Sequence, residues 1–345
     1  MPTKEDLKYF QAMPLDIKVA MTRTRIREWV NAFGESGVYV SFSGGKDSTV
    51  LLHLVRELYP EVPAVFVNTG LEYPEIQAFA KSFDNVTILR PQMRFDKVIQ
   101  KYGYPIIGKN AAHFLYYYKV QNTDNKYNKF FDGTYRKDNG DQSRFDYSKY
   151  EAIAHLDFVV SDKCCDRMKK DPIHKYGKTT ERVPFIATLA EESFMRMKSW
   201  YQTGCNSFEG KTPQSKPMSF WTENDVLQYI HENNIPIASV YGDIIKDEGQ
   251  MSMFESNEGC KFRTSGCDRT GCIFCGFGAH MEAPGESRFK RLKETHPKQY
   301  NYCIGGGKYD IDGLWKPDNR GLGMGHVFDE LNKLYSKGGK PFIDY

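Results

Sequence analysis

The chain has 345 residues, of which 40% are hydrophobic and 26% charged, and its formal net charge is +3. This length is sufficient to bury a hydrophobic core, and the small net charge gives no overall electrostatic argument for binding nucleic acid. The charged first residues are not followed by the apolar segment of a signal peptide, and no apolar run reaches membrane-spanning length. The sequence therefore predicts a soluble, cytoplasmic protein without a membrane partner.

Three strands and two helices are predicted to follow an N-terminal helical segment, residues 1–36. Their ranges are Val38–Phe42, Asp47–Tyr59, Ala64–Asn68, about residues 74–83, and Val86–Arg90. The apolar residues of the first helix recur at helical spacing, and the strands are short and rich in valine. Strands that alternate with helices predict an α/β fold with a parallel sheet, whose ligands bind at the carboxyl ends of the strands.

The turn after the first strand is the strongest candidate for a functional site. Gly44 and Gly45 allow unusual backbone angles and close approach of a ligand, and the following helix directs its positive end at the turn. Ser43, Ser48 and Thr49 add hydroxyl donors, and Lys46 adds a positive charge. This composition favours a phosphate site over an ordinary strand–helix corner. The spacing is neither the Walker pattern nor the dinucleotide pattern with three glycines.

Ser43-Gly-Gly-Lys-Asp-Ser48 resembles the PP-loop of the ATP-pyrophosphatase and adenylyl-sulfate reductase superfamily. The resemblance implies a doubly wound sheet of the adenine nucleotide alpha-hydrolase kind that binds an adenine nucleotide. The turn Asn68–Glu75 is similar to the Asp-Thr-Gly-x-x-Phe-Pro-Glu-Thr segment of adenylyl-sulfate and phosphoadenylyl-sulfate (PAPS) reductases, with Asn68 in place of the aspartate. A helix N-terminus with Pro74 in its first turn explains the same residues, and both interpretations can hold together.

Two later blocks extend the resemblance. Glu192, Ser193 and Arg196 match a Gly-x-Arg-x-x-Glu-Ser-x-x-Arg segment of the same superfamily, although Leu189 replaces its first arginine. Residues 217–230 resemble another family segment and are predicted to form an amphipathic helix capped by Thr222. The basic stretch 288–293 is predicted to be a solvated helix face rather than a contact with a nucleic-acid backbone.

The cysteines are clustered, and in a reducing compartment such clusters bind metal or carry out redox chemistry. Cys164 and Cys165 follow a predicted strand, Phe158–Ser161, and four more cysteines lie at positions 260, 267, 272 and 275. Four thiolates suit either zinc or an iron–sulfur cluster. The resemblance to adenylyl-sulfate reductases implies that one [4Fe–4S] cluster is held by Cys164, Cys165, Cys272 and Cys275. A zinc site of Cys260, Cys267, Cys272 and Cys275, or a contribution from Cys205, is the alternative.

Aromatic and basic residues alternate in residues 113–150, which are predicted to be an insertion. Such rings can stack on the bases of a single-stranded nucleic acid or on a free nucleobase, but packing onto the domain is favoured here. The predicted domains are the N-terminal helices 1–36, a nucleotide-binding domain 37–245 that contains this insertion, and a cysteine-rich extension with a glycine-rich tail, 246–345.

The predicted residues fall into two groups. The catalytic group is Lys46, Asp47 and Arg196. The nucleotide-binding group is Ser41, Ser43, Gly44, Gly45, Lys46, Asp47, Ser48, Thr49, Asn68, Thr69, Gly70 and Glu192.

Three functions are compatible with this sequence. The favoured one is ATP-dependent sulfur transfer with release of pyrophosphate, using Mg²⁺ and the cluster. The alternatives are reduction of adenylyl sulfate or PAPS to sulfite, and a non-catalytic nucleotide-binding module with structural zinc. A reductase is disfavoured because the family's Glu-Cys-Gly-Leu-His motif is missing around Cys303. The expected partners are a sulfur-donor or electron-donor protein, a nucleic-acid or nucleobase acceptor, and a second copy in a homodimer.

Overall fold

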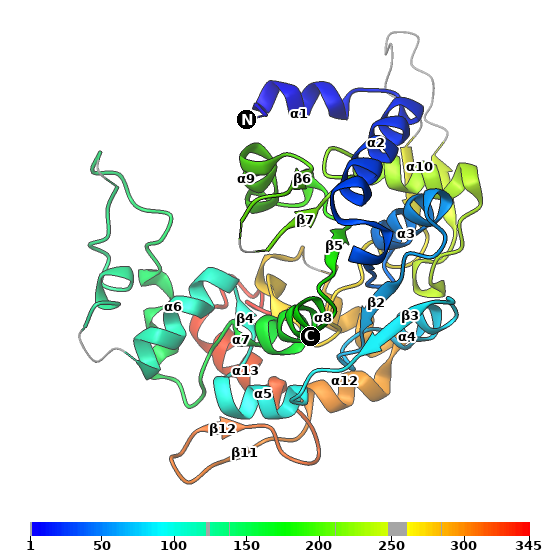
Figure 1. The fold of residues 1–345 in the computed structure, drawn as a ribbon. Helices are drawn as coiled ribbons and strands as arrows, with labels where there is room; N and C mark the ends of the chain where they lie inside the picture. Colours follow the sequence, from blue (N-terminus) through cyan, green and yellow to red (C-terminus); the bar gives the residue numbers. More distant parts are fainter. Residues whose placement is uncertain (1, 122–124, 138, 211, 248–260, 284) are drawn as a thin grey trace. The chain divides into compact units, whose positions relative to one another are not determined.

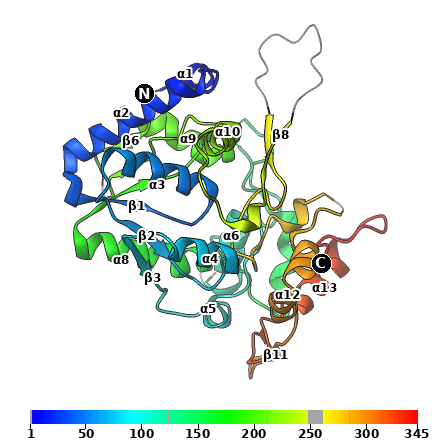
Figure 2. The ribbon, with the colours of Figure 1, turned by 90° about the vertical axis from the view of Figure 1, so that its right-hand side faces the viewer.

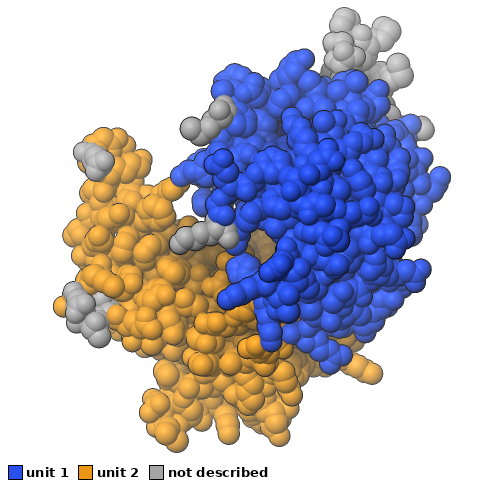
Figure 3. Space-filling view, viewed as in Figure 1, with its two compact units in different colours: residues 1–68, 72–90, 172–271 blue, residues 69–71, 91–171, 272–345 orange. Residues whose placement is uncertain are grey.

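A computed structural model of the protein describes residues 2–121, 125–137, 139–210, 212–247, 261–283 and 285–345. The chain forms two compact units, each assembled from separate stretches of sequence (Figure 3). Unit 1 contains residues 1–68, 72–90 and 172–271, and unit 2 contains residues 69–71, 91–171 and 272–345. The sequence predicts continuous domains instead. Among the helices in the described part of the chain, none is both long and apolar enough to span a membrane.

Unit 1 is built on a six-stranded sheet with the order β3-β2-β1-β5-β7-β6 (Figure 1). All neighbouring pairs are parallel except β6 with β7. The strands are β1 (Val38–Ser41), β2 (Ala64–Val67), β3 (Val86–Leu89), β5 (Val183–Ile186), β6 (Asn206–Ser207) and β7 (Gln214–Ser215). The chain runs from β1 to β2 on one side and returns to β5 on the other. The carboxyl ends of β1 and β5 therefore flank the topological switch point where α/β sheets bind ligands.

Helices cover both faces of this sheet. Figure 2 shows α2 and α3 on one side of β1 and β2, and α8 on the other. Tyr39 of β1 points to the second side, where its ring lies 5.1 Å from that of Tyr176 in α8, whereas Val38 and Val40 alternate to the opposite face. The helices of unit 1 are α1 (Lys4–Gln11), α2 (Leu15–Phe33), α3 (Lys46–Leu58), α4 (Pro74–Lys81), α8 (Asp171–Thr180), α9 (Phe194–Thr203) and α10 (Glu223–Asn233). The predicted doubly wound α/β fold is confirmed.

A buried ion pair joins α2 to α10. Lys18 is 2% exposed, and its Nζ lies 2.6 Å from Oδ2 of Asp225 and 2.7 Å from the backbone oxygen of Gln11. Asp225 also accepts a hydrogen bond from the backbone N–H of Thr222, the predicted cap of α10. The carboxylate thus neutralises a charge that water cannot reach, and it closes the first turn of α10.

We expect Asp225→Asn to lower the free energy of unfolding by about 3–5 kcal/mol, because it leaves the Lys18 charge buried without an anion. Asparagine still accepts the hydrogen bond from Thr222, so the cap is retained. The double variant Lys18→Met/Asp225→Asn removes both charges and should recover most of the loss. Equilibrium unfolding in urea measures all three proteins, and equal losses in the single and double variants would contradict the assignment.

Unit 2 is mainly helical. Its helices are α5 (Phe95–Tyr102), α6 (Lys109–Val120), α7 (Lys163–Cys165), α11 (Arg288–Thr295), α12 (Pro297–Ile304) and α13 (Met324–Tyr335). A short parallel pair, β4 (Ile106–Ile107) with β10 (Gly276–Phe277), joins the middle of the chain to its cysteine-rich part. The hairpin β11 (Lys308–Tyr309) and β12 (Trp315–Lys316) precedes α13. Unit 1 contains a second hairpin, β8 (Ile244–Asp247) and β9 (Lys261–Thr264).

One part of the predicted secondary structure is wrong. Residues 158–161 do not form a strand, because their only pairing among the described residues is a single bridge from Val160 to Tyr104. The fourth parallel strand of the sheet is β5 instead. The aromatic insertion also begins with a helix, α6, which covers Lys109–Val120.

The rings of the aromatic insertion pack on one another. Phe114 of α6 lies 4.2 Å from the ring of Phe130, and Tyr118 lies 4.7 Å from Phe131. Lys129 lies over two rings of the same segment, those of Phe130 and Tyr135. These contacts are those of a self-packed insertion, as the sequence favours.

Candidate functional site

The phosphate loop after β1 has a backbone that only glycine can adopt without strain. Gly44 has φ +72°, and a Cβ at this position would lie 2.9 Å from the Ile76 side chain. The loop therefore packs directly against the start of α4. Gly45 follows as the residue that precedes α3, so the N-terminal end of a 13-residue helix faces the loop.

The three loop hydroxyls shape this turn. Ser48 donates to the backbone oxygen of Gly45 at 2.9 Å, and Thr49 donates to the same oxygen at 3.0 Å. Ser43 lies 3.0 Å from the Ser48 hydroxyl, and its Oγ accepts a hydrogen bond from the N–H of Gly45. Ser48 and Thr49 are buried, whereas Ser43 faces the pocket in front of the loop. Two of the predicted phosphate donors therefore hold the turn itself.

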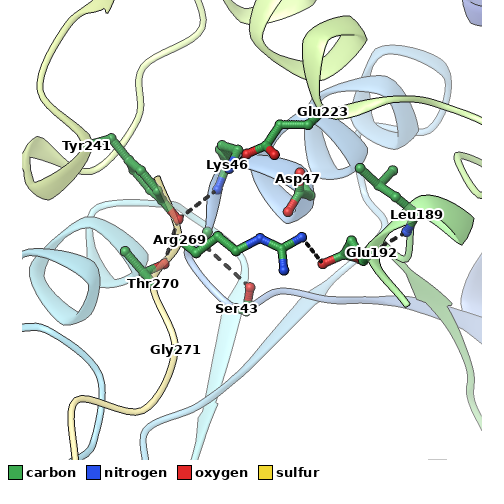
Figure 4. Close-up of a pocket in the computed structure, with 11 residues that line it drawn as sticks. Ser43, Lys46, Asp47, Leu189, Glu192, Glu223, Tyr241, Arg269, Thr270 and Gly271 are labelled. Carbon is green, nitrogen blue, oxygen red and sulfur yellow. Dashed lines mark hydrogen bonds and ion pairs between the residues drawn. The ribbon is translucent and has the colours of Figure 1, made fainter. Parts of the chain in front are cut away.

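This pocket has a volume of about 210 Å³ and lies within unit 1 (Figure 4). It is lined by Ser43, Gly45, Lys46, Asp47, Leu189, Glu192, Glu223, Tyr241, Arg269, Thr270 and Gly271. The loop after β1 supplies the first four, and the segment after β5 supplies the next two. The pocket thus lies at the switch point of the sheet, where the strand order predicts a ligand.

Lys46 is held by groups of its own chain. Its side chain is 5% exposed, and Nζ lies 2.6 Å from Oε1 of Glu223 and 2.6 Å from the backbone oxygen of Asp268. Glu223 is the first residue of α10 and is 41% exposed. The ammonium group can therefore exchange this half-exposed carboxylate for a more highly charged phosphate without leaving the pocket.

Asp47 lies beside Lys46 on the wall of the pocket (Figure 4). Burial raises the pKa of the Asp47 carboxyl above its usual value, and the charge of Lys46 opposes this rise. A carboxylate with an elevated pKa next to an open pocket is typical of a functional group, because stability alone would favour a neutral residue there.

We expect Asp47→Asn to stabilise the nucleotide-free protein. Because the pKa of Asp47 is higher in the folded than in the unfolded state, its contribution to stability falls as pH rises above about 4, the unfolded value, and stays low at neutral pH. The melting temperature of the variant should therefore exceed that of the wild type at pH 7, and the difference should vanish near pH 4. Nucleotide-dependent turnover should fall about a hundredfold, as when one charge-stabilising group is removed. Thermal denaturation between pH 4 and pH 8 measures the first effect, and a wild type as stable as the variant at pH 7 would contradict it.

Glu192 and Arg269 line the opposite wall of the pocket, and Arg196 pairs with Glu192. Glu192 accepts a hydrogen bond from the N–H of Leu189, forms an ion pair with Arg196 of α9, and lies 3.4 Å from Nη2 of Arg269. Burial lowers the pKa of Arg196 most, and the nearby positive charge of Arg269 lowers it further. Two cations thus share one carboxylate, which leaves a net positive wall for an anionic ligand. Arg196 itself does not line the pocket, whereas Arg269 does.

The remaining residues predicted to bind the nucleotide lie at the end of β1 and in the turn after β2. Ser41 is the last residue of β1, and Asn68 continues β2 by donating its backbone N–H to Leu89. Thr69 accepts a hydrogen bond from the N–H of Leu71, and Gly70 has φ +76°. Asn68, Thr69 and Gly70 form the turn after β2, and of these Thr69 and Gly70 belong to unit 2.

The sequence does not single out four of the residues that line the pocket: Glu223, Tyr241, Arg269 and Thr270. Glu223 lies in a segment whose helical pattern explains it fully. Tyr241 and Arg269 come from irregular segments about 195 and 220 residues after the loop, and nothing in their local pattern distinguishes them.

Four thiols line one small cavity in unit 2. Its volume is about 30 Å³, and its walls are Leu71, Phe95, Pro105, Cys164, Cys165, Met168, Lys169, Cys272 and Cys275. Cys164 and Cys165 lie in α7, and the N–H of Cys275 bonds to the oxygen of Cys272 in a tight turn before β10. Gly276 lies against the backbone of Pro105, where a Cβ would come within 2.8 Å of its oxygen. This close packing places the Cys-x-x-Cys turn beside α7.

The donor set of this cavity fits a thiolate-bound metal centre. The four cysteines form no disulfide, and the other walls are apolar except for Lys169. The hydrogen bond between the two neighbouring thiols lowers the pKa of Cys165 to about 6 and raises that of Cys164, while Lys109 further lowers the pKa of Cys165. Within the described residues, no three His, Cys, Asp or Glu side chains converge closely enough for a single metal ion.

The other cysteines lie elsewhere. Cys205 precedes β6 in unit 1, and Cys267 is buried in unit 1 with its N–H bonded to Val240. Cys303 is fully buried in α12. Cys260 lies outside the described residues. None of the three described ones lines the cavity in which the predicted set of four meets.

Relatives of the chain are found among enzymes of sulfate metabolism. The chain is 29% identical to sulfate adenylyltransferase subunit 2 of Shewanella frigidimarina, over 70% of this chain and 77% of the relative. It is 26% identical to the same subunit of Rhizobium tropici, over 66% and 69%. An uncharacterized protein of Methanocaldococcus jannaschii is 23% identical over 81% of this chain, and the match spans only 51% of that relative.

Two solved structures share parts of the fold. PAPS reductase from Candida auris in its phosphate complex has a TM-score of 0.37 and 12% identity, over 69% of this chain and 91% of the other. The U34-tRNA thiolase of Methanococcus maripaludis with its [4Fe-4S] cluster has a TM-score of 0.31 and 15% identity, over 64% and 66%. At these scores the similarity identifies no function.

The family comparison covers both halves of the nucleotide pocket. Residues 37–134 and 117–276 match the family described as phosphoadenosine phosphosulfate reductase domain. These residues contain the phosphate loop, the Glu192 segment and the Arg269 segment. The matched ranges also contain the strands β1 and β5 that flank the pocket. The chain belongs to the phosphoadenosine phosphosulfate reductase domain family.

Proposed function

We propose that this chain activates a substrate with ATP, releases pyrophosphate and transfers sulfur to the activated position. The observation that carries the proposal is the pocket at the switch point, which is lined by four residues of the phosphate loop and by Arg269. The names of the sulfate adenylyltransferase relatives support adenylation, since that is the reaction for which those proteins are named.

The residues of the pocket match the charge that this reaction develops. An oxygen of the acceptor attacks the α-phosphorus of ATP, the bond to the β-phosphate oxygen breaks, and pyrophosphate leaves. Negative charge then grows on phosphate oxygens, which Lys46, the loop N–H groups and Arg269 are placed to stabilise. Asp47, Glu192 and Glu223 are the carboxylates that line the pocket and would hold a nucleotide-bound Mg²⁺. A sulfur nucleophile then replaces the adenylate, and AMP leaves.

The cysteine cavity is proposed as the site of a [4Fe–4S] cluster. A [4Fe–4S] cluster is held by four thiolates, which agrees with the four thiols that line this cavity. Cys164, Cys165, Cys272 and Cys275 would hold it, and it would supply an electron or, once one thiolate leaves its iron, a site for a sulfide. The same proposal includes three partners. A donor protein supplies the sulfur or the electrons, a nucleic acid or a nucleobase accepts the sulfur, and a second copy of the chain completes a homodimer.

Reduction of adenylyl sulfate or PAPS is the second candidate, and the family name favours it. Such a reduction needs a reachable cysteine that attacks sulfur. Cys303 is fully buried, burial raises its pKa, and its sulfur contacts that of Met324 at 3.5 Å. This thiol cannot reach a substrate from its position in the core, so sulfur transfer is the better-supported reaction.

The decisive experiment supplies each nucleotide separately to the anaerobically purified protein. Sulfur transfer predicts pyrophosphate and AMP from ATP in the presence of sulfide and an acceptor pool of small RNA and free nucleosides. Sulfite from adenylyl sulfate or PAPS, without any use of ATP, would establish the reductase instead. Nucleotide binding without either product would indicate a binding module.

A further inference from the structure

Two hydroxyl groups lie directly in front of the phosphate loop. The Tyr241 hydroxyl accepts a hydrogen bond of 3.3 Å from the backbone N–H of Lys46, and it lies 2.5 Å from Oγ1 of Thr270. A Cβ placed on Gly45 would lie 3.2 Å from the Tyr241 oxygen and 3.7 Å from that of Thr270. Both oxygens therefore occupy the space that a loop glycine keeps open for the oxygens of a ligand.

The side chain of Lys46 also bonds to the segment that contains Thr270. The backbone oxygen of Asp268 accepts a hydrogen bond of 2.6 Å from Nζ. Lys46 thus donates its backbone N–H to Tyr241 (Figure 4), and its ammonium group bonds to the backbone oxygen of Asp268 as well as to the Glu223 carboxylate. These are the donors that a phosphate requires, so phosphate and this segment compete for them.

Backbone hydrogen bonds and close packing hold Tyr241 against residues 265–270. The N–H of Gly266 donates to the oxygen of Tyr241 at 2.9 Å, and the N–H of Cys267 donates to Val240 at 2.9 Å. A Cβ at Gly266 would come within 2.5 Å of the Val240 oxygen, which shows that the two backbones are in direct contact. Displacement of the Tyr241 ring must therefore move Thr270 as well.

We propose that Tyr241, Asp268 and Thr270 form a latch, whose oxygens bond to the same loop donors as phosphate oxygens and are displaced when a nucleotide binds. The proposal rests on the proposed function in one respect, namely that the loop binds nucleotide phosphate. Only Gly271 separates Thr270 from Cys272, and consecutive Cα atoms are fixed 3.8 Å apart. Release of the latch therefore moves a residue that lies two positions before Cys272.

The latch predicts that removal of its hydroxyl groups raises the affinity for ATP, and measurement of that affinity tests it. Tyr241→Phe and Thr270→Val keep their size and remove one competing hydroxyl each. Because a nucleotide then displaces one hydrogen bond fewer, each variant should bind ATP roughly two- to tenfold more tightly in calorimetry. Tyr229→Phe is the matched control, since its hydroxyl bonds to His53 rather than to the loop, and its affinity should not change. Weaker binding by the first two variants would overturn the latch and make these hydroxyls nucleotide ligands.

Hydrogen exchange of the full chain tests the movement. Peptides within residues 264–275 should change their exchange rate when ATP binds to the wild type. In the double variant Tyr241→Phe/Thr270→Val, the rate without ATP should already equal that of the nucleotide-bound wild type. Tight ATP binding without any change in these peptides would overturn the latch alone. Absence of ATP binding in the wild type and in all variants would overturn the proposed function, and the latch with it.

Discussion

Replacement of Lys46 by methionine should lower pyrophosphate release from ATP by about a hundredfold or more. Methionine retains the apolar part of the side chain but removes the ammonium group, which is the only cation supplied by the loop itself. The loss of one group that stabilises transition-state charge costs about 10²- to 10³-fold in rate. The affinity for ATP should fall as well, since the same charge contacts the phosphates in the ground state. Steady-state kinetics and calorimetry separate the two effects.

The structure supplies a matched control. Lys81, at the end of α4 in the same unit, is exposed and does not line the pocket. Lys81→Met changes the net charge equally and should leave both quantities unchanged. The half-exposed Glu223 regains water when Lys46 is replaced, so the melting temperature should change little. Full activity in Lys46→Met would place the nucleotide elsewhere.

The first part of the sheet could be predicted because its signals are local. The runs that form β1, β2 and β3 are short and valine-rich, and each is followed by a glycine or proline turn. The central strand β5 carries no such signal. Pro184 lies within it and pairs with Tyr39 of β1, although proline is normally confined to edge strands. Its position follows from the return of the chain through unit 2, which no local pattern records.

The same distinction applies to the pocket. Gly44, Gly45 and Lys46 are neighbours in sequence, so their joint role is visible in six residues. Tyr241 and Arg269 meet them only because the chain folds back after α10. The cysteines are an intermediate case. The spacing of residues 272 and 275 indicates a metal site, but it does not show which other cysteines complete that site. Resemblance to a family pointed to α7, and the cavity brings the same four thiols together.

Serine replacements in the cysteine cavity should remove the metal centre. Cys164, Cys165, Cys272 and Cys275 all line the cavity, and a four-iron cluster needs four thiolates. The wild type should contain about four irons per chain and absorb at about 400 nm. Each single variant should therefore lose most of this iron and most of this absorption. Absorption spectra and iron analysis of anaerobically purified protein measure both.

Cys205→Ser and Cys267→Ser are the controls within the same chain, because neither residue lines the cavity. Both should retain the full absorption and iron content. A colourless wild type with one zinc per chain would contradict the cluster. If Cys267→Ser then lost that zinc while Cys164→Ser kept it, the alternative set with Cys260 would be established instead.

The iron content of the Lys46→Met variant connects the two experiments. Lys46 belongs to unit 1 and the four thiols belong to unit 2, so the loss of the loop charge should leave the iron in place. Conversely, serine at position 164, far from the loop in sequence, should leave ATP binding intact while sulfur transfer is lost. Such a pair of results would separate nucleotide activation from sulfur delivery. Loss of ATP binding in Cys164→Ser would instead show that the metal centre is needed to fold the nucleotide pocket.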